Sequence, residues 1–415
     1  MPDVMLDIPE SVVPDEVQRR QVADLFRGMR SDGVRVFVPG RIELIGQHVD
    51  YAGGSSLTVA TRRGLAAVAG PIQEPLVRVR SALGTVEIPL NRNAHGSGWE
   101  KYAITVVRRV VRNVPGPVGG AEVVIRGNLP PAAGMSSSSA LVTALFLAWG
   151  HAAGWIRSLP LSADKRTLAE YLSAVENGRP YQDLPGEPGV GTLGGSQDHT
   201  AVLCSESGQI KRYRYLRPAL EGQWAWPSGT VPVVLDSGVQ AEKSGDRLED
   251  YNRASRLSAV LFDNARRSFP DLPALGFLTP EQCRELAGKV NGVLLQRLRA
   301  FEWEMAAVED ASASLDRGDT AGFAAAINVS QEGAERLLGN QIPQTVQLAR
   351  AARQAGALCA KSFGAGFGGA VWALVAEEDT AAFADRVRQQ CAAGVFVEAP
   401  GPGAFMLDGR EVWPA

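Results

Sequence analysis

One short stretch of the chain gathers side chains of five different chemical types. Residues 40–54 read GRIELIGQHVDYAGG, which sets polar and charged groups between an apolar, strand-like run and a turn. The groups are Arg41, Gln47, His48, Asp50 and Tyr51. An ordinary surface loop needs no such assortment, whereas a site for a small polar molecule needs charges, donors and acceptors close together. We therefore take this stretch as the first candidate binding segment.

A second stretch has the character of an anion site. Residues 127–150 read GNLPPAAGMSSSSALVTALFLAWG, in which a strand ends, Pro and Gly shape a loop, and four serines lead into an apolar helix. Free N–H groups at a helix N-terminus bind phosphate, and serine hydroxyls add contacts or ligate Mg²⁺. One serine would suffice as a helix cap, so the run of four favours phosphate binding over an ordinary capped helix. The Gly-Lys-Ser/Thr ending of a Walker loop is missing.

A glycine-rich loop and two carboxylates complete the candidate chemistry. The loop, KSFGAGFGGAVWALV (361–375), permits close backbone approach to a ligand or another segment. A strand rather than a helix is expected after it, so it does not fit a dinucleotide-binding motif. Glu176 and Asp198 flank a long Gly/Pro-rich connection and could serve as metal ligand and base. Taken singly, each is also compatible with a helix-surface Glu and a turn Asp.

The elements that must position these residues follow from apolar periodicity and turn signals. Helices are predicted at residues 15–30, 99–114, 138–155, 165–177 and 380–390, and strands at VRVFV, GAEVVIRG, VPVVLD, AVWALV and GVFVEA. SSLTVATRRGLAAVAG is predicted to form strands joined by a glycine turn, and TAVLCSESGQIKRYRYL to form a hairpin. The turn-rich EGQWAWPSGT suggests a division into domains 1–222 and 223–415. Helices and strands alternate without internal repeats, which predicts an α+β fold.

Composition narrows the class of protein. The 415 residues carry a net charge of −3 without a block of like charge, which gives no sign of nucleic-acid or membrane binding. The longest apolar window is about half a membrane span, and the N-terminus lacks a signal-peptide core. Four cysteines without a CxxC pair favour neither a zinc cage nor a disulfide framework. We expect a cytoplasmic protein whose cysteines are free and mostly buried.

Together the three motifs resemble those of the GHMP kinases, a superfamily of small-molecule kinases. The opening stretch is similar to the galactokinase signature G-R-x-N-L-I-G-E-H-x-D-Y-x-G-G. LPPAAGMSSSSA resembles the family's phosphate loop, and SFGAGFGG resembles its third motif. The resemblance implies an ATP-dependent sugar kinase acting on the C1 hydroxyl of galactose or a related monosaccharide. It implies an N-terminal domain like ribosomal protein S5 domain 2 and a C-terminal ferredoxin-like domain. We expect a monomer without nucleic-acid or membrane partners.

The resemblance also implies roles for particular residues. Asp198 would face the hydroxyl that is phosphorylated, as base or orienting group, and Arg41 would neutralise charge beside it. Ser138 and Glu176 would hold Mg²⁺. The sugar ligands would be Gln47, His48, Asp50 and Tyr251, and the phosphates of ATP would lie on Gly134, Met135, Ser136, Ser137 and Ser138. Trp99 would lie beside the adenine or serve as a core anchor.

Three departures from the family pattern bear on the substrate. Glu43 replaces the usual Asn, Gln47 replaces the usual Glu, and Met-Asp-Gln becomes Gln197-Asp198-His199. Gln47 is either a neutral isostere or a group that favours a uronic acid or another C6-modified sugar, because an amide can also donate. A sugar-sensing regulator on the same scaffold and a kinase of a non-sugar alcohol are the remaining alternatives.

Overall fold

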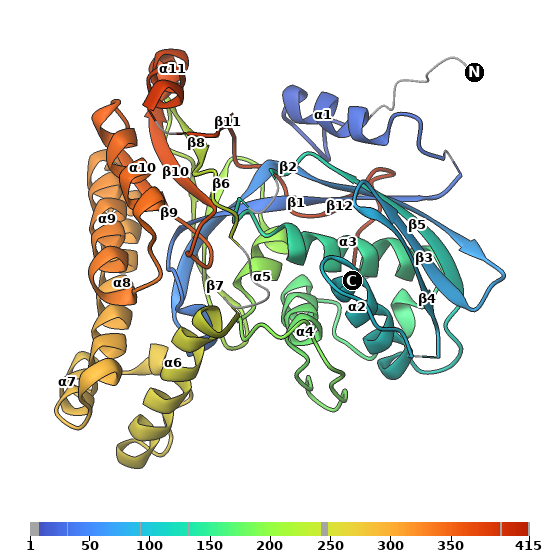
Figure 1. The fold of residues 1–415 in the computed structure, drawn as a ribbon, viewed down its shortest axis with the longest axis horizontal. Helices are drawn as coiled ribbons and strands as arrows, with labels where there is room; N and C mark the ends of the chain where they lie inside the picture. The colour runs from blue at the N-terminus through green and yellow to red at the C-terminus, as the bar shows by residue number, and fades with distance from the viewer. Residues whose placement is uncertain are drawn as a thin grey trace.

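The computed structural model describes residues 8–30, 32–91, 93–130, 133–241, 248–390 and 392–413 (Figure 1). In these residues the helices are α1 (Glu16–Phe26), α2 (Glu100–Asn113), α3 (Ser137–Ala152), α4 (Lys165–Asn177), α5 (Gln197–Cys204), α6 (Leu248–Ser268), α7 (Pro280–Ala287), α8 (Gly292–Asp316), α9 (Thr320–Gly333), α10 (Pro343–Gln354) and α11 (Thr380–Gln390). The strands are β1 (Val34–Ile45), β2 (Ser55–Ile72), β3 (Leu76–Ser81), β4 (Gly84–Pro89), β5 (Gly120–Gly127), β6 (Gln209–Arg214), β7 (Ala219–Ala225), β8 (Thr230–Asp236), β9 (Cys359–Ser362), β10 (Ala370–Ala376), β11 (Gly394–Val397) and β12 (Phe405–Met406).

The larger sheet runs in the order β12-β1-β2-β5-β3-β4, with β6 paired to β2 and β7 to β6. Alternate residues of β1 point to opposite faces, as the period of a strand requires. Val36 and Val38 pack in the core formed with α2, α3 and α4, whereas Phe37 packs in the cluster that contains α1. Helices therefore cover both faces, with α1 on one side and α3 on the other (Figure 1).

The smaller sheet is antiparallel and runs β11-β8-β10-β9. One of its faces packs with α10 and α11 through Leu348 and Phe383. The other face joins Trp372 and Phe323 of α9 to Ile42 of the larger sheet in one cluster. The two sheets thus share a core, and the fold is the expected mixture of helices and largely antiparallel strands. The predicted domain division at residue 222 stays a prediction. Strand β7 continues past that point to Ala225, and β12, near the C-terminus, pairs with the larger sheet.

Two predicted elements differ in the structure. Residues 55–72 form the single strand β2 rather than two strands and a turn. Gly64 lies inside this strand and does not turn the chain. It permits the close approach of β1, because a Cβ on it would lie 2.3 Å from the Val38 carbonyl oxygen. The first half of the predicted hairpin at 200–216 is wrong as well, because Gln197–Cys204 form helix α5. A short apolar run such as TAVLC does not distinguish strand from helix by its pattern.

The limits of α4 follow from ordinary local signals. Asp164 caps α4 by accepting from the Arg166 N–H, and Gly178 ends it with φ 78°. Helix α3 is apolar on all sides and buried over most of its length.

Cys204, Cys283 and Cys359 are free, and Cys391 lies outside the described residues. In the described part of the chain, no helix is long and apolar enough to cross a membrane.

Candidate active site

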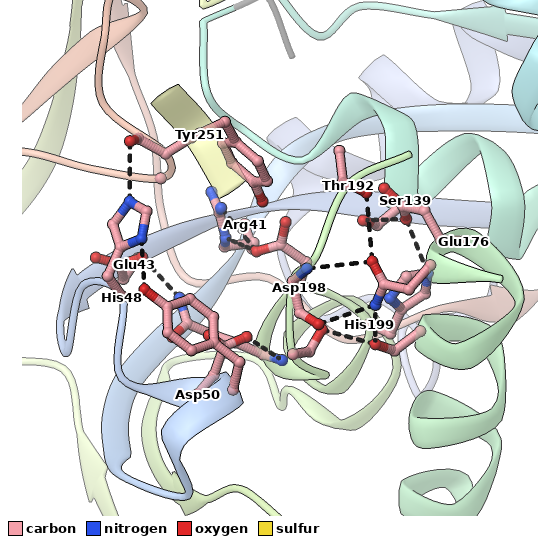
Figure 2. A pocket seen from close by; sticks show the side chains of 18 residues that line it. Arg41, Glu43, His48, Asp50, Ser139, Glu176, Thr192, Asp198, His199 and Tyr251 are labelled. Atoms are coloured by element: carbon pink, nitrogen blue, oxygen red, sulfur yellow. Dashed lines mark hydrogen bonds and ion pairs between the residues drawn. The ribbon is translucent and has the colours of Figure 1, made fainter. Parts of the chain in front are cut away.

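A cavity opens where the larger sheet meets the start of α6 and the glycine-rich loop. Its lining comes from β1 and the loop after it, α3, α4, the connection at 192–195, the first turn of α5, α6 and residues 364–365. The empty space inside it is about 550 Å³, a figure that includes open solvent at its mouth. Figure 2 shows the side chains that face it. Six predicted site residues line it: Arg41, His48, Asp50, Glu176, Asp198 and Tyr251.

An ion pair between β1 and α5 lies in this cavity. Asp198 Oδ1 accepts from Nε of Arg41 at 2.8 Å and from its terminal nitrogen at 2.7 Å. The Arg41 side chain is only 2% exposed, and its other terminal nitrogen donates to the Gly134 carbonyl oxygen. The carboxylate is 21% exposed, so the pair presents a fixed anion to the cavity with its cation behind it. The two residues are 157 positions apart, which no local sequence pattern brings together.

Asp50 lies at the floor of the same cavity, and its surroundings leave no room for a larger neighbour. Its Oδ2 accepts from the Gln197 N–H at 3.4 Å. A Cβ on Gly195 would lie 2.5 Å from that oxygen, so only glycine fits there. Burial raises the pKa of Asp50, and the nearby charge of Asp198 raises it further. Backbone N–H groups around the carboxylate oppose the rise.

His48 is held on both sides of its ring. Nε2 lies 3.0 Å from the Ala365 carbonyl oxygen and must donate to it, because a carbonyl cannot. Nδ1 of the neutral ring then accepts from the Tyr51 hydroxyl at 2.9 Å. Arg297 of α8 donates to the His48 carbonyl oxygen and to the Tyr51 hydroxyl. The ring thereby ties the first sequence motif to the glycine-rich loop.

The long Gly/Pro-rich connection is fastened by two asparagines. Asn177, the last residue of α4, donates to the Gly194 carbonyl and accepts from the Gly194 N–H. Asn252 of α6 donates to the Gly191 carbonyl and accepts from the Leu193 N–H. These bonds fix the segment that carries the cavity wall up to Asp198. They also hold Tyr251, the neighbour of Asn252, in the cavity lining.

The tyrosine keeps its proton in this environment. Burial raises the pKa of Tyr251 well above its usual value, and the nearby carboxylates Asp198, Asp50 and Glu176 add to the rise. Its hydroxyl is therefore a neutral hydrogen-bonding group at neutral pH.

Glu176 is approached by a serine and a histidine. The hydroxyl of Ser139 donates to Glu176 Oε2 at 3.0 Å, and His199 Nε2 lies 3.4 Å from the same oxygen. Ser139 rather than Ser138 is thus the serine that the structure places on Glu176, and Ser138 does not line the cavity. A Ser and one carboxylate fit Mg²⁺, which uses one or two carboxylates and takes its other ligands from water and phosphate. Among the described residues no cluster of three or more metal-ligating side chains occurs.

The serine loop is shaped for a ligand that brings acceptors. Ser136 adopts φ 58°, an uncommon backbone state for a serine, directly before α3 begins. Its buried hydroxyl has no hydrogen-bond partner among the described residues. The loop also meets the glycine-rich loop, since a Cβ on Gly364 would lie 3.1 Å from the Gly134 carbonyl oxygen. The N-terminus of α3, this hydroxyl and the close glycines fit a bound phosphate chain.

Two predicted ligands have other surroundings. Gln47 is 2% exposed and does not line the cavity. Its amide nitrogen donates to the Gly364 carbonyl at 2.7 Å, and its amide oxygen lies 3.4 Å from Lys361 Nζ. Trp99 is partly buried against the core of α2 and α3 and also lies outside the cavity lining. Their predicted contacts with sugar and adenine remain predictions.

Glu43, like Gln197 and His199, lines the cavity although the sequence pointed to it only as a departure from the family pattern. It is 2% exposed, and its Oε2 accepts from Gln197 Nε2 at 2.7 Å. Burial raises the pKa of Glu43 to about 7, against the opposing charges of Lys361 and Arg41. The alternation of β1 could have pointed to it, since Glu43 lies two residues after Arg41 on the same face. The structural roles of Asn252 and Arg297 had no local signal, because their partners lie far away in sequence.

Comparison with known proteins supplies the family. The sequence matches the galactokinase galactose-binding signature at residues 25–71, the GHMP kinase N-terminal domain at 101–186 and the GHMP kinase C-terminal domain at 311–393. It is 29% identical over 362 residues to a galactokinase of Mycobacterium bovis, covering 85% of this chain and 91% of that protein. A galactokinase of Lactiplantibacillus plantarum is 26% identical over 363 residues, covering 85% and 88%.

The chain belongs to the GHMP kinases, in the galactokinase branch. Its fold matches the crystal structure of Lactococcus lactis galactokinase complexed with galactose with a TM-score of 0.77, at 23% identity over 93% of this chain and 98% of that one. L. major mevalonate kinase in complex with R-mevalonate matches with a TM-score of 0.56, at 16% identity over 88% and 95%. The three matched ranges of this GHMP kinase contain Arg41 and Glu176 but not Asp198 or Tyr251. The position of those two residues in the cavity comes from the structure.

Proposed function

We propose that this GHMP kinase transfers the γ-phosphoryl group of ATP to the anomeric C1 hydroxyl of galactose or a closely related monosaccharide. The observation that carries the proposal is the Arg41–Asp198 ion pair in a cavity lined by carboxylates, two histidines and two tyrosines. Such groups match the many hydroxyls of a sugar. The named relatives are galactokinases, which favours galactose among the sugars.

Phosphoryl transfer requires positioning and charge neutralisation more than covalent chemistry from the protein. In the proposed reaction the acceptor hydroxyl lies against Asp198, which takes or orients its proton. Arg41 holds the carboxylate in place and offsets negative charge as the phosphoryl group arrives. Asp50 and Tyr251 bind further hydroxyls of the same sugar, and the ring of His48 keeps the wall between the first motif and the glycine-rich loop closed.

ATP is assigned to the serine loop. The phosphates would lie on the loop from Gly134 to Ser138 at the N-terminus of α3, where Ser136 offers its buried hydroxyl. Mg²⁺ would be held by Glu176 with a serine hydroxyl and would neutralise the phosphate oxygens. We assign that hydroxyl to Ser139, which contacts Glu176, with Ser138 as the alternative that the family resemblance implies.

A sugar panel tests the proposal. Purified protein is incubated with Mg-ATP and galactose, glucose, mannose, a pentose, galacturonate or mevalonate, and ADP release and product mass are measured. We expect galactose or a neutral relative to give the highest kcat/KM. ADP release that does not depend on any of these acceptors, together with no phosphorylated product, would reject the proposal and favour a sensing protein. Phosphomevalonate as the main product would place the protein in another branch.

A further inference from the structure

Glu43 places a carboxylate in the cavity lining at a position where the galactokinase signature has Asn. That signature has an Asn at position 43 and a Glu at position 47, where this chain has Glu43 and Gln47. The structure separates the two side chains. Gln47 is bonded beneath the glycine-rich loop, to Gly364 and Lys361, whereas Glu43 lines the cavity. The amide is thus used by the protein itself, and the nearby acid belongs to the site.

Strand β1 aims Glu43 at the cavity. Arg41 and Glu43 are two residues apart and share a face, and β1 shows irregular pairing with β2 between Pro39 and Arg41 and again between Glu43 and Ile45. Bulges of this kind re-aim side chains beside active sites. Both residues line the cavity, and Figure 2 draws Glu43 among the side chains around it.

One side-chain oxygen of Glu43 and one of Gln197 have no hydrogen-bond partner among the described residues. Glu43 Oε2 accepts from Gln197 Nε2 at 2.7 Å, but Glu43 Oε1 is buried and has no hydrogen-bond partner among the described residues. Lys361 Nζ is 3.9 Å from that oxygen, beyond hydrogen-bond distance. Gln197 Oε1 is also buried and has no partner in the same part of the chain. Glu43 and Gln197 are 2% and 4% exposed, so both acceptors are unsatisfied side-chain atoms of residues that line the cavity.

Buried acceptors are normally satisfied, so the geometry asks for a ligand that brings O–H or N–H donors. A sugar hydroxyl is such a donor. A carboxylate on the ligand is not, because an ionised carboxylate only accepts. The site therefore discriminates between a neutral polyol and a uronic acid.

We propose that Glu43 and Gln197 form an acceptor pair that binds hydroxyl groups of the sugar, so that Glu43, and not Gln47, is the specificity-determining residue of this cavity. The proposal rests on the proposed sugar kinase activity and names the group that reads the sugar. It assigns galacturonate as a poor substrate.

The test asks which hydroxyl of the sugar depends on Glu43 and which on Gln47. kcat/KM is measured for galactose and its 2-, 3-, 4- and 6-deoxy analogues with the wild type, Glu43→Gln, Glu43→Ala and the matched control Gln47→Ala. Loss of a hydrogen bond to a charged group lowers kcat/KM by roughly ten- to hundred-fold. We expect the wild type to lose that factor for at least one deoxy sugar. In Glu43→Ala, removal of the same hydroxyl should lower kcat/KM by less than about threefold. In Gln47→Ala, each deoxy sugar should lower kcat/KM by the same factor as in the wild type.

A second measurement uses only the wild type, in case the Glu43 variants do not fold. At the position read by the acceptor pair, a fluoro sugar should be as poor as the deoxy sugar, because fluorine cannot donate. A fluoro sugar that matches galactose at every position would overturn the proposal. So would an unchanged deoxy pattern in the active Glu43 variants, or a pattern lost in Gln47→Ala instead. A wild type that phosphorylates no sugar would reject the proposed function itself, which is a separate result.

Discussion

Replacing Asp198 by Asn removes the charge and the basicity of the residue while it keeps its size. Asp198 is held by two nitrogens of Arg41 within 2.8 Å, so the Asn side chain can occupy the same position with its oxygen toward the guanidinium. A general base contributes about 10²–10⁴-fold, which corresponds to about 3–5 kcal/mol of transition-state stabilisation at 1.36 kcal/mol per tenfold. We therefore expect kcat to fall by that factor.

The cost to folding should be smaller than the cost to catalysis. Removing one partner of a fully buried ion pair costs about 3–5 kcal/mol. Asp198 is 21% exposed and Asn retains an oxygen that accepts from Arg41, so we expect only about 1–2 kcal/mol of lost stability. Thermal unfolding of the two proteins measures this difference.

The assay is initial-rate ADP release with saturating sugar, together with the Kd for ATP. Asp183→Asn is the matched control, because Asp183 is an exposed residue of the same connection, and it should keep wild-type turnover. A turnover of Asp198→Asn within about threefold of the wild type would refute the role in proton transfer, given the range expected for a base. A collapse of ATP binding together with a large loss of stability would show that Asp198 is a structural residue.

Three further predictions follow from the same cavity. Gly195→Ala puts a Cβ 2.5 Å from Asp50 Oδ2 and should lower kcat/KM for the sugar by roughly ten- to hundred-fold, whereas Gly288→Ala, whose nearest neighbour is 3.5 Å away, should be neutral in both kinetics and melting. Glu176→Gln should raise the Mg²⁺ concentration for half-maximal rate by at least about tenfold, and an unchanged Mg²⁺ titration would remove Glu176 from the metal site. Burial raises the pKa of Glu43 from 4.5 to about 7. Between these two pH values the folded protein keeps the Glu43 proton, whereas the unfolded chain releases it. The free energy of unfolding should therefore fall as the pH rises from about 4.5 to 7. The fall is up to roughly 3 kcal/mol; Glu43→Gln should abolish it, and parallel pH–stability curves for the two proteins would contradict the assignment.

Local patterns in the sequence predicted local structure well. The predicted helix at 165–177 coincides with α4, because a capping Asp, an amphipathic run and a glycine all agree on its limits. The first half of β1 was likewise predicted from the apolar run VRVFV, although the strand continues to Ile45 and carries Arg41 and Glu43 in its second half. The hydroxyl, carboxylate and glycine motifs pointed to phosphate chemistry, and six of the residues singled out for the site line one cavity.

Contacts between distant segments were not predictable in this way. Gln47 has the position of a sugar ligand in the sequence motif. In the structure its side-chain amide is hydrogen-bonded to Gly364 and Lys361, which are more than 300 residues away in sequence. The contact between Ser139 and Glu176 depends on how α3 is rotated against α4, which four consecutive serines leave open. Helix α5 was mistaken for a strand because TAVLC has an ambiguous pattern, and only tertiary packing decides its form.

Phosphoryl transfer from ATP to the anomeric hydroxyl of a sugar can be followed by ³¹P NMR of the reaction with Mg-ATP and galactose labelled with ¹³C at C1. We expect a new phosphomonoester signal that is coupled to the labelled carbon, together with ADP in equal amount. A phosphoester on any other carbon, or ATP that stays intact while galactose is unchanged, would contradict it.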